Sequence, residues 1–299
     1  VGADAQEKIA HMNDGDIVLL ENLRFDKREK KNDEGFCREL AALGDAYVND
    51  AFGTAHRAHA STAGVAALLP AYAGFLLSKE VATLGGMLEQ PKRPFVAILG
   101  GSKVSDKIKV IDALIDTCDT LIIGGCMCFT FLLAQGKTVG TSLKEDEWVE
   151  RAFEMLQKAK DKGVSLLLPS DVVVADKFAE DARTETVSVD GIPQDMMGLD
   201  IGPETAKAYA DAIAQAKTVF WNGPMGVFEM KAFEEGTKQV ALAVAANAEA
   251  DTIIGGGDSV AAVNKFDLAS KMTFISTGGG ASMELVQGEK LPGVEALRK

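Results

Sequence analysis

The sequence lacks the features that mark secreted, zinc-binding and membrane proteins. It has four cysteines in 299 residues: Cys37, Cys118, Cys126 and Cys128. Their spacing contains no zinc-type pair of pairs, and a core of this size needs no disulfides, so we expect reduced thiols in a cytoplasmic protein. Apolar runs such as Leu121–Ile123 are far too short to cross a bilayer, so no membrane is expected as a partner. No signal-peptide pattern opens the chain, and its first residue is Val1 rather than Met, which predicts a processed chain or a fragment.

Positive charge is also scarce. Lys and Arg number 31 against 44 Asp and Glu, for a net charge of -13. An acidic surface repels nucleic acid, so we expect no nucleic-acid partner, and an anionic substrate would need a local basic site. The length favours two domains, and 47% apolar with 25% charged residues is typical of a globular protein with a sizeable core.

Five short apolar runs each lead into a glycine-rich turn. The runs are Phe95–Leu99, Thr120–Ile123, Thr218–Trp221, Thr252–Ile254 and Thr273–Ser276. Continuous rather than alternating apolar runs predict strands buried on both faces, and therefore a parallel sheet covered by helices. The turns would then share one edge of the sheet, where glycine lets backbone N–H groups approach a phosphate. The alternative is that compact α/β proteins simply use glycine in such turns.

The remaining pattern predicts further elements. We expect strands at 16–20 and 46–49, helices at 32–43, 78–90, 143–162, 203–217 and 231–247, and a hairpin at 187–191 with Asp190-Gly191 as its turn. Trp148, Phe153 and Leu156 should share the apolar face of the 143–162 helix. Pro91 and Pro94 would stop the 78–90 helix, and the domain boundary is placed there.

Two lysines stand beside the first glycine turn. Lys103 and Lys107 are four residues apart, so on a helix they would share a face and could hold two phosphates. The helix dipole disfavours lysine near a helix start, which hints at a bound anion, although a solvated basic face is the plainer alternative. The segment is not a Walker A loop, because no Lys-Ser or Lys-Thr pair follows its second glycine at the required spacing.

Other polar residues also follow predicted strands. Asp258 could hold Mg²⁺ on a nucleotide or cap the following helix, and the two roles are compatible. Arg24 and Arg57 could each grip a carboxylate or phosphate, although ion pairing at the surface is the more common role for such residues. His56 could equally be a capped loop histidine.

Six segments together resemble the phosphoglycerate kinase family. They are Glu21–Phe25, Asp50–Arg57, Gly100–Lys107, Trp221–Glu229, Gly255–Ser259 and Ser276–Ala281. The resemblance implies two Rossmann-like α/β domains with parallel sheets, the N-terminal one incomplete, joined by a helical hinge. It implies a partial acid-substrate domain at 1–76, a hinge helix at 77–92, a nucleotide-binding domain at 93–283 and a C-terminal segment at 284–299 that returns toward the first domain.

The family's activity is reversible phosphoryl transfer between 1,3-bisphosphoglycerate and MgADP, giving 3-phosphoglycerate and MgATP in glycolysis. By resemblance, Arg24, His56 and Arg57 would bind the acid, and Lys103, Gly278, Gly279 and Gly280 would stabilise the phosphoryl group in transfer. The nucleotide would be bound by Gly101, Lys107, Gly198, Asn222, Glu229, Gly256, Gly257, Asp258 and Ser259. Asp258 would also contact Mg²⁺, and the protein would be a monomer.

The resemblance also implies a departure, because the family's chains begin with about another quarter of sequence that carries further basic substrate residues. A nucleotide-binding fragment with little or no catalysis is therefore the alternative function, and the first domain would have an exposed sheet edge. A nicotinamide-dependent dehydrogenase is disfavoured, because no Gly-x-Gly-x-x-Gly follows the first strand with an acid about 20 residues later. A purely structural protein would not need five glycine turns on one edge.

Overall fold

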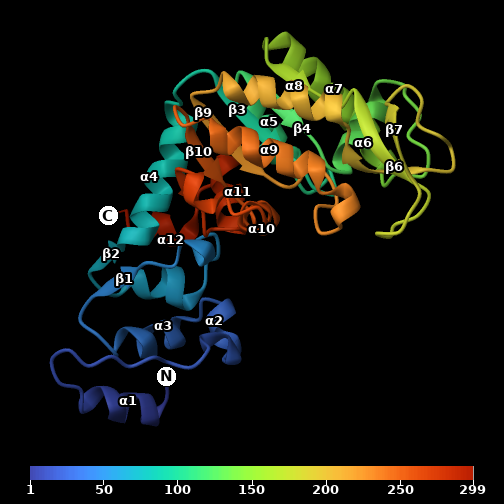
Figure 1. Cartoon of the computed structure of the whole chain (residues 1–299). Helices are drawn as coiled ribbons and strands as arrows, with labels where there is room; N and C mark the ends of the chain where they lie inside the picture. The colour runs from blue at the N-terminus through green and yellow to red at the C-terminus, as the bar shows by residue number, and fades with distance from the viewer. Residues whose placement is uncertain (299) are drawn as a thin grey trace. The chain divides into compact units, whose positions relative to one another are not determined.

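The computed structural model describes residues 1–298, which form two compact units (Figure 1). Of the described residues, unit 1 comprises 1–84 and 288–298, and unit 2 comprises 85–287. The division falls within one continuous helix, α4, at Phe75–Glu89. Among the described residues, no helix is both long and apolar enough to cross a membrane.

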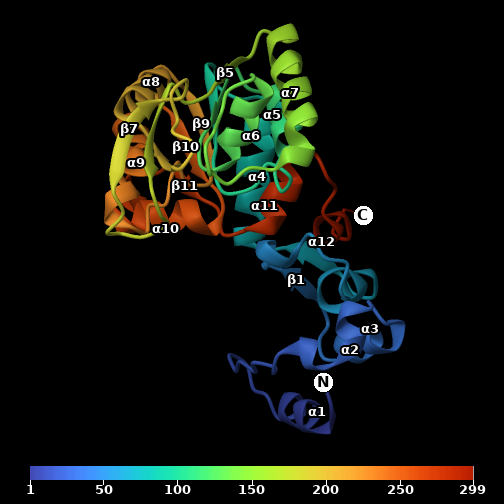
Figure 2. The ribbon, with the colours of Figure 1, turned by 90° about the vertical axis from the view of Figure 1, so that its right-hand side faces the viewer.

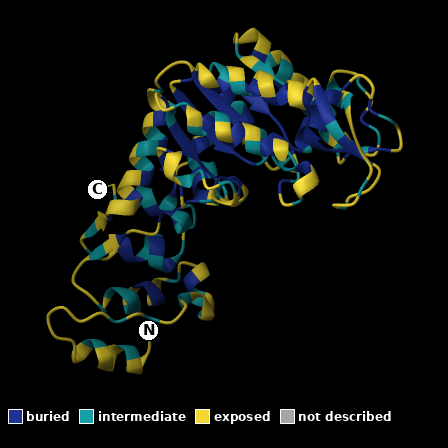
Figure 3. Cartoon of the chain, in the orientation of Figure 1, coloured by how far each residue is buried: buried dark blue, intermediate teal, exposed yellow. Residues whose placement is uncertain are grey.

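Unit 2 is built on a six-stranded parallel sheet in the order β11-β10-β9-β3-β4-β5. Its strands are β3 at Phe95–Leu99, β4 at Thr120–Ile123, β5 at Ser165–Leu167, β9 at Thr218–Asn222, β10 at Asp251–Ile254 and β11 at Phe274–Ile275. Every residue of β3 and β9 is buried, as continuous apolar runs predict (Figure 3). The predicted parallel α/β class is confirmed, and all five glycine turns follow strands at the same edge.

Helices cover both faces of this sheet (Figure 2). One face carries α5 at Ile108–Ile115, α6 at Met127–Ala134, α7 at Val149–Asp161 and α11 at Gly280–Val286; the other carries α8 at Pro203–Ala214, α9 at Glu235–Ala246 and α10 at Gly257–Lys265. Trp221 and Tyr209 are the largest side chains of the core under α8 and α9, and each is about 1% exposed or less. This packing holds the carboxyl edge of the sheet rigidly in place.

The apolar face predicted for the helix at 143–162 is wrong. In α7 the buried side chains are Ala152, Met155 and Ala159, whereas Phe153 is 50% exposed. Ala152 and Ala159 let the helix pack closely on its neighbours α6 and α5, whereas Phe153 points away from them. The predicted end of this helix near residue 162 is confirmed, since α7 ends at Asp161 and Gly163 adopts φ +72°.

Unit 2 also contains an antiparallel three-stranded sheet in the order β7-β6-β8. The strands are β6 at Asp171–Ala175, β7 at Thr184–Ser188 and β8 at Met197–Ile201. The antiparallel pairing implied by a hairpin is found, but the predicted hairpin at 187–191 is wrong, because β7 pairs with the preceding strand β6, to which residues 176–183 connect it. A turn is present there, closed by Gly191 N–H donating to Ser188 O at 2.9 Å, but it does not join two paired strands. Strand β8 pairs with the other edge of β6, which a local turn signal cannot reveal.

Unit 1 has a parallel pair of strands, β1 at Tyr47–Asn49 and β2 at Ala71–Ala73, together with several short helices. The helices are α1 at Ala3–Ala10, α2 at Lys27–Lys30, α3 at Glu34–Ala41 and α12 at Pro292–Glu295. The strand predicted at 16–20 is wrong: Ile17 and Leu19 are 92% and 94% exposed, and the structure pairs no described strand with this stretch. A strand needs a hydrogen-bonded neighbour, so a short apolar run alone does not make one.

Candidate active site

The glycine turns at the carboxyl edge of the sheet of unit 2 interlock through their backbones. Gly100 N–H donates to Asn222 O at 3.0 Å, Gly101 N–H donates to Pro224 O at 3.1 Å, and Gly125 N–H donates to Met225 O at 2.9 Å. A side chain at Gly100 or Gly125 would overlap neighbouring main chain, and Gly125 adopts φ +64°. These glycines are therefore required by packing alone, which is the plain alternative considered for the glycine turns.

Two other glycines on this edge have no such packing reason. A Cβ at Gly257 or Gly279 would meet no other atom within 4 Å. Gly257 begins α10, and Gly279 precedes α11 with φ +52°. Their main chains are open to an approaching ligand, as a phosphate site at a helix start requires.

Lys107 is the cation held most tightly among the turns. It is the N-cap residue of α5, and its Nζ donates to Asn222 O at 2.9 Å and also to Asn222 Oδ1. Burial lowers the pKa of Lys107 to about 8, and the charges of Asp258 and Asp106 only partly oppose this effect. The structure thus brings together Lys107 and Asn222, with the carboxylate of Asp258 near enough to act on the lysine.

Lys103 does not share a helical face with Lys107, which corrects the sequence-based expectation. Helix α5 begins only at Ile108, so Lys103 lies in the preceding loop, where it is exposed. Glu145 anchors that loop by accepting from Ser105 N–H at 3.0 Å and from Ser105 Oγ at 2.6 Å. The lysine side chain therefore extends from a loop whose backbone is fixed.

The first turn of α10 combines an internal contact with an open carboxylate. Ser259 is fully buried, and its Oγ accepts from Gly223 N–H at 2.5 Å. Asn222 Nδ2 donates to Gly255 O at 2.8 Å, so both ends of that amide are engaged. Gly256 caps the helix with φ +88°, while Asp258 is exposed. Ser259 and Asn222 thus join neighbouring turns, and Asp258 remains available to a ligand.

Gly198 and Glu229 are linked through one turn. Gly198 lies in β8, where a side chain would collide with the ring of Phe129. The next residue, Leu199, accepts at its O from Val227 N–H at 2.9 Å, two residues before the exposed Glu229. Lys265 Nζ donates to Phe228 O at 2.6 Å and supports the same turn from α10.

Gly278, Gly279 and Gly280 lead into α11. Gly278 is buried, and its N–H donates to Ser276 Oγ at 3.2 Å, so this amide has an internal partner. Ser276 Oγ in turn lies 2.6 Å from Ser282 Oγ. Gly280 is exposed. The open part of the segment therefore begins at Gly279.

In unit 1, the structure brings Arg24, His56 and Arg57 into one basic region. Arg57 Nε donates to His56 Nε2 at 3.3 Å, and His56 Nδ1 is a buried nitrogen without a hydrogen-bond partner among the described residues. Arg24 is exposed in a turn that Asn22 Oδ1 caps at 3.1 Å. Burial lowers the pKa of His59, and the charges of Arg24 and Arg57 add to this lowering, so both guanidinium groups lie near that ring.

Sequence reasoning did not single out two residues of this region, His59 and Glu29. Glu29 is 2% exposed and accepts from Ser61 N–H at 3.1 Å and from Ser61 Oγ at 2.5 Å. Its Oε1 lies 3.9 Å from His59 Nδ1. The second histidine of the His56-Arg57-Ala58-His59 segment was a signal for His59, whereas Glu29 looks like any surface helix residue in the sequence.

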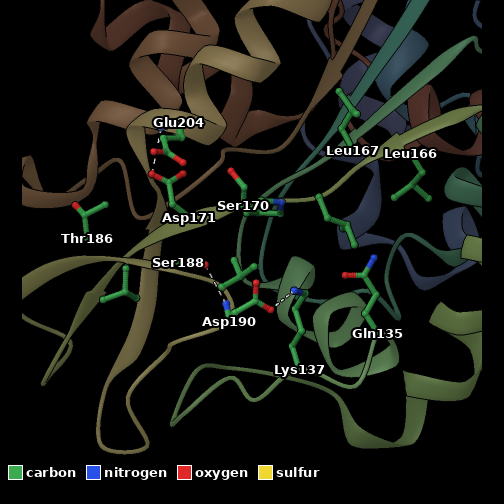
Figure 4. A pocket seen from close by; sticks show the side chains of 14 residues that line it. Gln135, Lys137, Leu166, Leu167, Ser170, Asp171, Thr186, Ser188, Asp190 and Glu204 are labelled. Carbon is green, nitrogen blue, oxygen red and sulfur yellow. Dashed lines mark hydrogen bonds and ion pairs between the residues drawn. The ribbon is translucent and has the colours of Figure 1, made fainter.

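A separate cavity of about 690 Å³ lies between the β5–β6 connection and β7 (Figure 4). Lys137 and Asp190 form an ion pair across it at 2.5 Å. None of the predicted site residues lines this cavity.

Among the described residues, no three His, Cys, Asp or Glu side chains cluster as a metal-binding group. The exposed carboxylate of Asp258 nevertheless fits Mg²⁺, which takes one or two protein carboxylates and completes its shell with phosphate oxygens and water. The donor set therefore fits a metal that arrives with a nucleotide.

A parallel sheet with open glycine turns, a half-buried lysine and an exposed carboxylate at its carboxyl edge is typical of Rossmann-like α/β proteins that bind phosphate groups. The model of the phosphoglycerate kinase family matches residues 1–289, and the chain belongs to this family of glycolytic kinases.

Similar proteins agree with this assignment. The phosphoglycerate kinases of Trichodesmium erythraeum and Moorella thermoacetica are 57% and 60% identical over 99% of this chain, which spans 75% of each relative. The structure of phosphoglycerate kinase from Coxiella burnetii is 48% identical with a TM-score of 0.90, covering 94% of this chain and 72% of that one. The Pyrococcus horikoshii enzyme is 32% identical with a TM-score of 0.86, covering 99% and 76%.

Proposed function

We propose that unit 2 binds MgADP or MgATP and that unit 1 contributes to binding 3-phosphoglycerate or 1,3-bisphosphoglycerate, for the reversible phosphoryl transfer of the family. The main support for nucleotide binding by unit 2 is the position of Lys107, whose Nζ is fixed between two glycine turns at the carboxyl edge of the sheet. A half-buried cation beside open backbone N–H groups is suited to a polyphosphate.

Lys107, with Gly101 and Asn222 beside it, would bind the nucleotide phosphates. Gly256 and Gly257 would present the start of α10 to a phosphate, and the open space at Gly257 supports this role. Ser259 would contribute indirectly, because its hydroxyl already holds Gly223. Gly198 and Glu229 would bind the nucleoside.

Asp258 would hold Mg²⁺ together with the nucleotide phosphates. When bound, the metal supplies positive charge that neutralises the phosphate oxygens. Asp258 is exposed at the start of α10, and its negative charge partly offsets the effect of burial on Lys107. The carboxylate would therefore orient the metal while the lysine binds a neighbouring phosphate oxygen.

Arg24, Arg57 and His56 would bind the acid substrate. The unpartnered Nδ1 of His56 supports a ligand role, because a buried polar nitrogen without a partner is costly. The substrate carboxylate is ionised at neutral pH and can attack phosphorus directly, so the reaction needs no general base.

Lys103 and the amides of Gly279 and Gly280 would stabilise the charge that spreads over the transferring phosphoryl group, with Gly278 shaping the segment. The exposure of Lys103 on an anchored loop supports this role, since its ammonium can follow the group as it moves. We propose that the protein works as a monomer in the cytoplasm, where its four free thiols would stay reduced.

Calorimetry with MgADP and with 3-phosphoglycerate, together with a coupled assay of ATP-dependent turnover, tests the proposal. We expect binding of both ligands and measurable turnover. Binding of MgADP with no turnover would favour the alternative, a nucleotide-binding protein with little catalysis. Failure to bind MgADP would contradict the nucleotide site itself.

A further inference from the structure

A buried aspartate of unit 2 lies directly against the turn that carries Glu229. Asp200 is in β8, two residues after Gly198, and is only 4% exposed. Its Oδ2 accepts from Gly236 N–H at 2.7 Å, and its Oδ1 accepts from Ile201 N–H at 2.9 Å. Gly236 lies in the first turn of α9, so this carboxylate ties the end of β8 to the start of that helix.

The same carboxylate also packs against the turn itself. A Cβ at Gly226 would lie 2.6 Å from Asp200 Cγ, and a Cβ at Gly236 would lie 2.8 Å from the same atom. Both distances are too short for real contacts, so the carboxylate occupies the space that side chains at these two positions would need. The main chain of the turn at Gly226 and the start of α9 at Gly236 therefore both pack against the carboxylate of Asp200.

An irregularity in β8 accompanies this placement. Asp200 stands opposite Val173 of β6, whereas Gly198 stands opposite Val174, so Leu199 has no partner across the pair. The carbonyl of Leu199 instead accepts from Val227 N–H at 2.9 Å. An extra residue in a strand commonly re-aims its neighbours at functional sites, and here it links β8 to the turn.

The first turn of α9 completes the support. Thr237, which is fully buried, accepts at Oγ1 from Met225 N–H at 3.0 Å and from Gly226 N–H at 3.3 Å. Thr237 follows Gly236 directly. Asp200 therefore holds the start of α9 through Gly236, and Thr237 in the same helical turn holds the loop at Met225 and Gly226. Burial raises the pKa of Asp200 to about 8, but in either protonation state both oxygens keep lone pairs for their N–H donors.

We propose that Asp200 is a positioning residue for the nucleoside part of the nucleotide. It holds the turn from Gly226 to Glu229 in place relative to Gly198 without touching the ligand itself. The inference rests on the proposed nucleotide site, and it adds a buried residue that controls the nucleoside end of that site separately from the phosphate end.

Calorimetry with MgATP and with magnesium tripolyphosphate distinguishes binding of the nucleoside from binding of the phosphates, because tripolyphosphate has no nucleoside. The weaker ligand is measured by displacement. In Asp200→Ala we expect the Kd for MgATP to rise about tenfold or more, while the Kd for tripolyphosphate changes less than about threefold. Thr237→Val, which removes the acceptor for the turn, should show the same selective loss and provides the test if Asp200→Ala does not fold.

Asp171→Ala is the matched control. Asp171 is 6% exposed and accepts from Thr205 N–H at 2.8 Å and from Glu204 N–H at 3.1 Å at the start of α8 (Figure 4). Like Asp200 it is a buried carboxylate that binds the start of a helix, but it does not pack against the turn from Gly226 to Glu229. It should lower thermal stability and leave the ratio of the two Kd values unchanged. Equal loss of both ligands in Asp200→Ala, or a selective loss also in Asp171→Ala, would overturn the inference. A wild-type chain that binds neither probe would overturn the nucleotide site and the inference together.

Discussion

Binding of a nucleotide phosphate to Lys107 should be accompanied by proton uptake. Burial places the pKa of this lysine at about 8, so about half of the free protein carries a neutral amine at pH 8. Moving a lysine pKa from 10.5 to about 8 corresponds to about 3 kcal/mol, which a bound phosphate can return by pairing with the ammonium. Lys107 would then be protonated in the nucleotide-bound protein.

The expected stoichiometry follows from that shift. If phosphate binding restores an ordinary pKa, MgADP should take up about 0.1 proton at pH 7, about 0.5 at pH 8 and about 0.9 at pH 9. Calorimetry in two phosphate-free buffers of different ionisation enthalpy measures this uptake directly. Lys107→Arg keeps its charge throughout this range, so its binding enthalpy should not depend on the buffer. Equal uptake by the wild type and by Lys107→Arg would refute the reasoning.

The pH dependence of folding stability should also reflect the lowered pKa of Lys107, and the direction of that shift fixes the sign of the effect. Because folding lowers the pKa of Lys107, the unfolded chain holds this proton to higher pH than the folded one, and the free energy of unfolding rises between pH 8 and 10.5. Measured against Lys107→Met, which cannot titrate, the wild type should gain about 1–3 kcal/mol over that interval. A difference between the two proteins that stays constant over this range would contradict the predicted pKa.

Four further changes test other parts of the site. Lys103→Ala should lower kcat at least about tenfold while the Kd for MgADP changes less than about threefold, because the lysine acts on the transferring group; equal losses would argue against that role. Gly125→Ala should cost at least about 2 kcal/mol in denaturant unfolding, because its Cβ would overlap the main chain of Gly101. Gly257→Ala should leave stability unchanged or slightly higher and weaken MgADP binding, so unchanged affinity would remove Gly257 from the phosphate site. Glu29→Ala should lower stability by about 1–3 kcal/mol and raise the KM for 3-phosphoglycerate more than that for MgATP, and a uniform change in both would make Glu29 purely structural.

The sequence by itself determined the layered architecture of unit 2 and the edge at which its turns meet. Runs such as Phe95–Leu99 are apolar at every position, and only a strand covered on both faces can bury all of them. Right-handed crossovers through helices then bring every turn after such a strand to one edge. That reasoning involves only local pattern and burial, which a single sequence carries.

Only the tertiary structure decided how the residues of that edge are used. It separated glycines required by backbone packing, such as Gly125, from open ones such as Gly257, and it placed Lys107 against Asn222 while Lys103 stayed in a loop. It also paired β7 with β6 and left 16–20 without a strand. Each of these outcomes depends on contacts between segments far apart in the chain, and local propensity does not encode which distant backbone will be the neighbour.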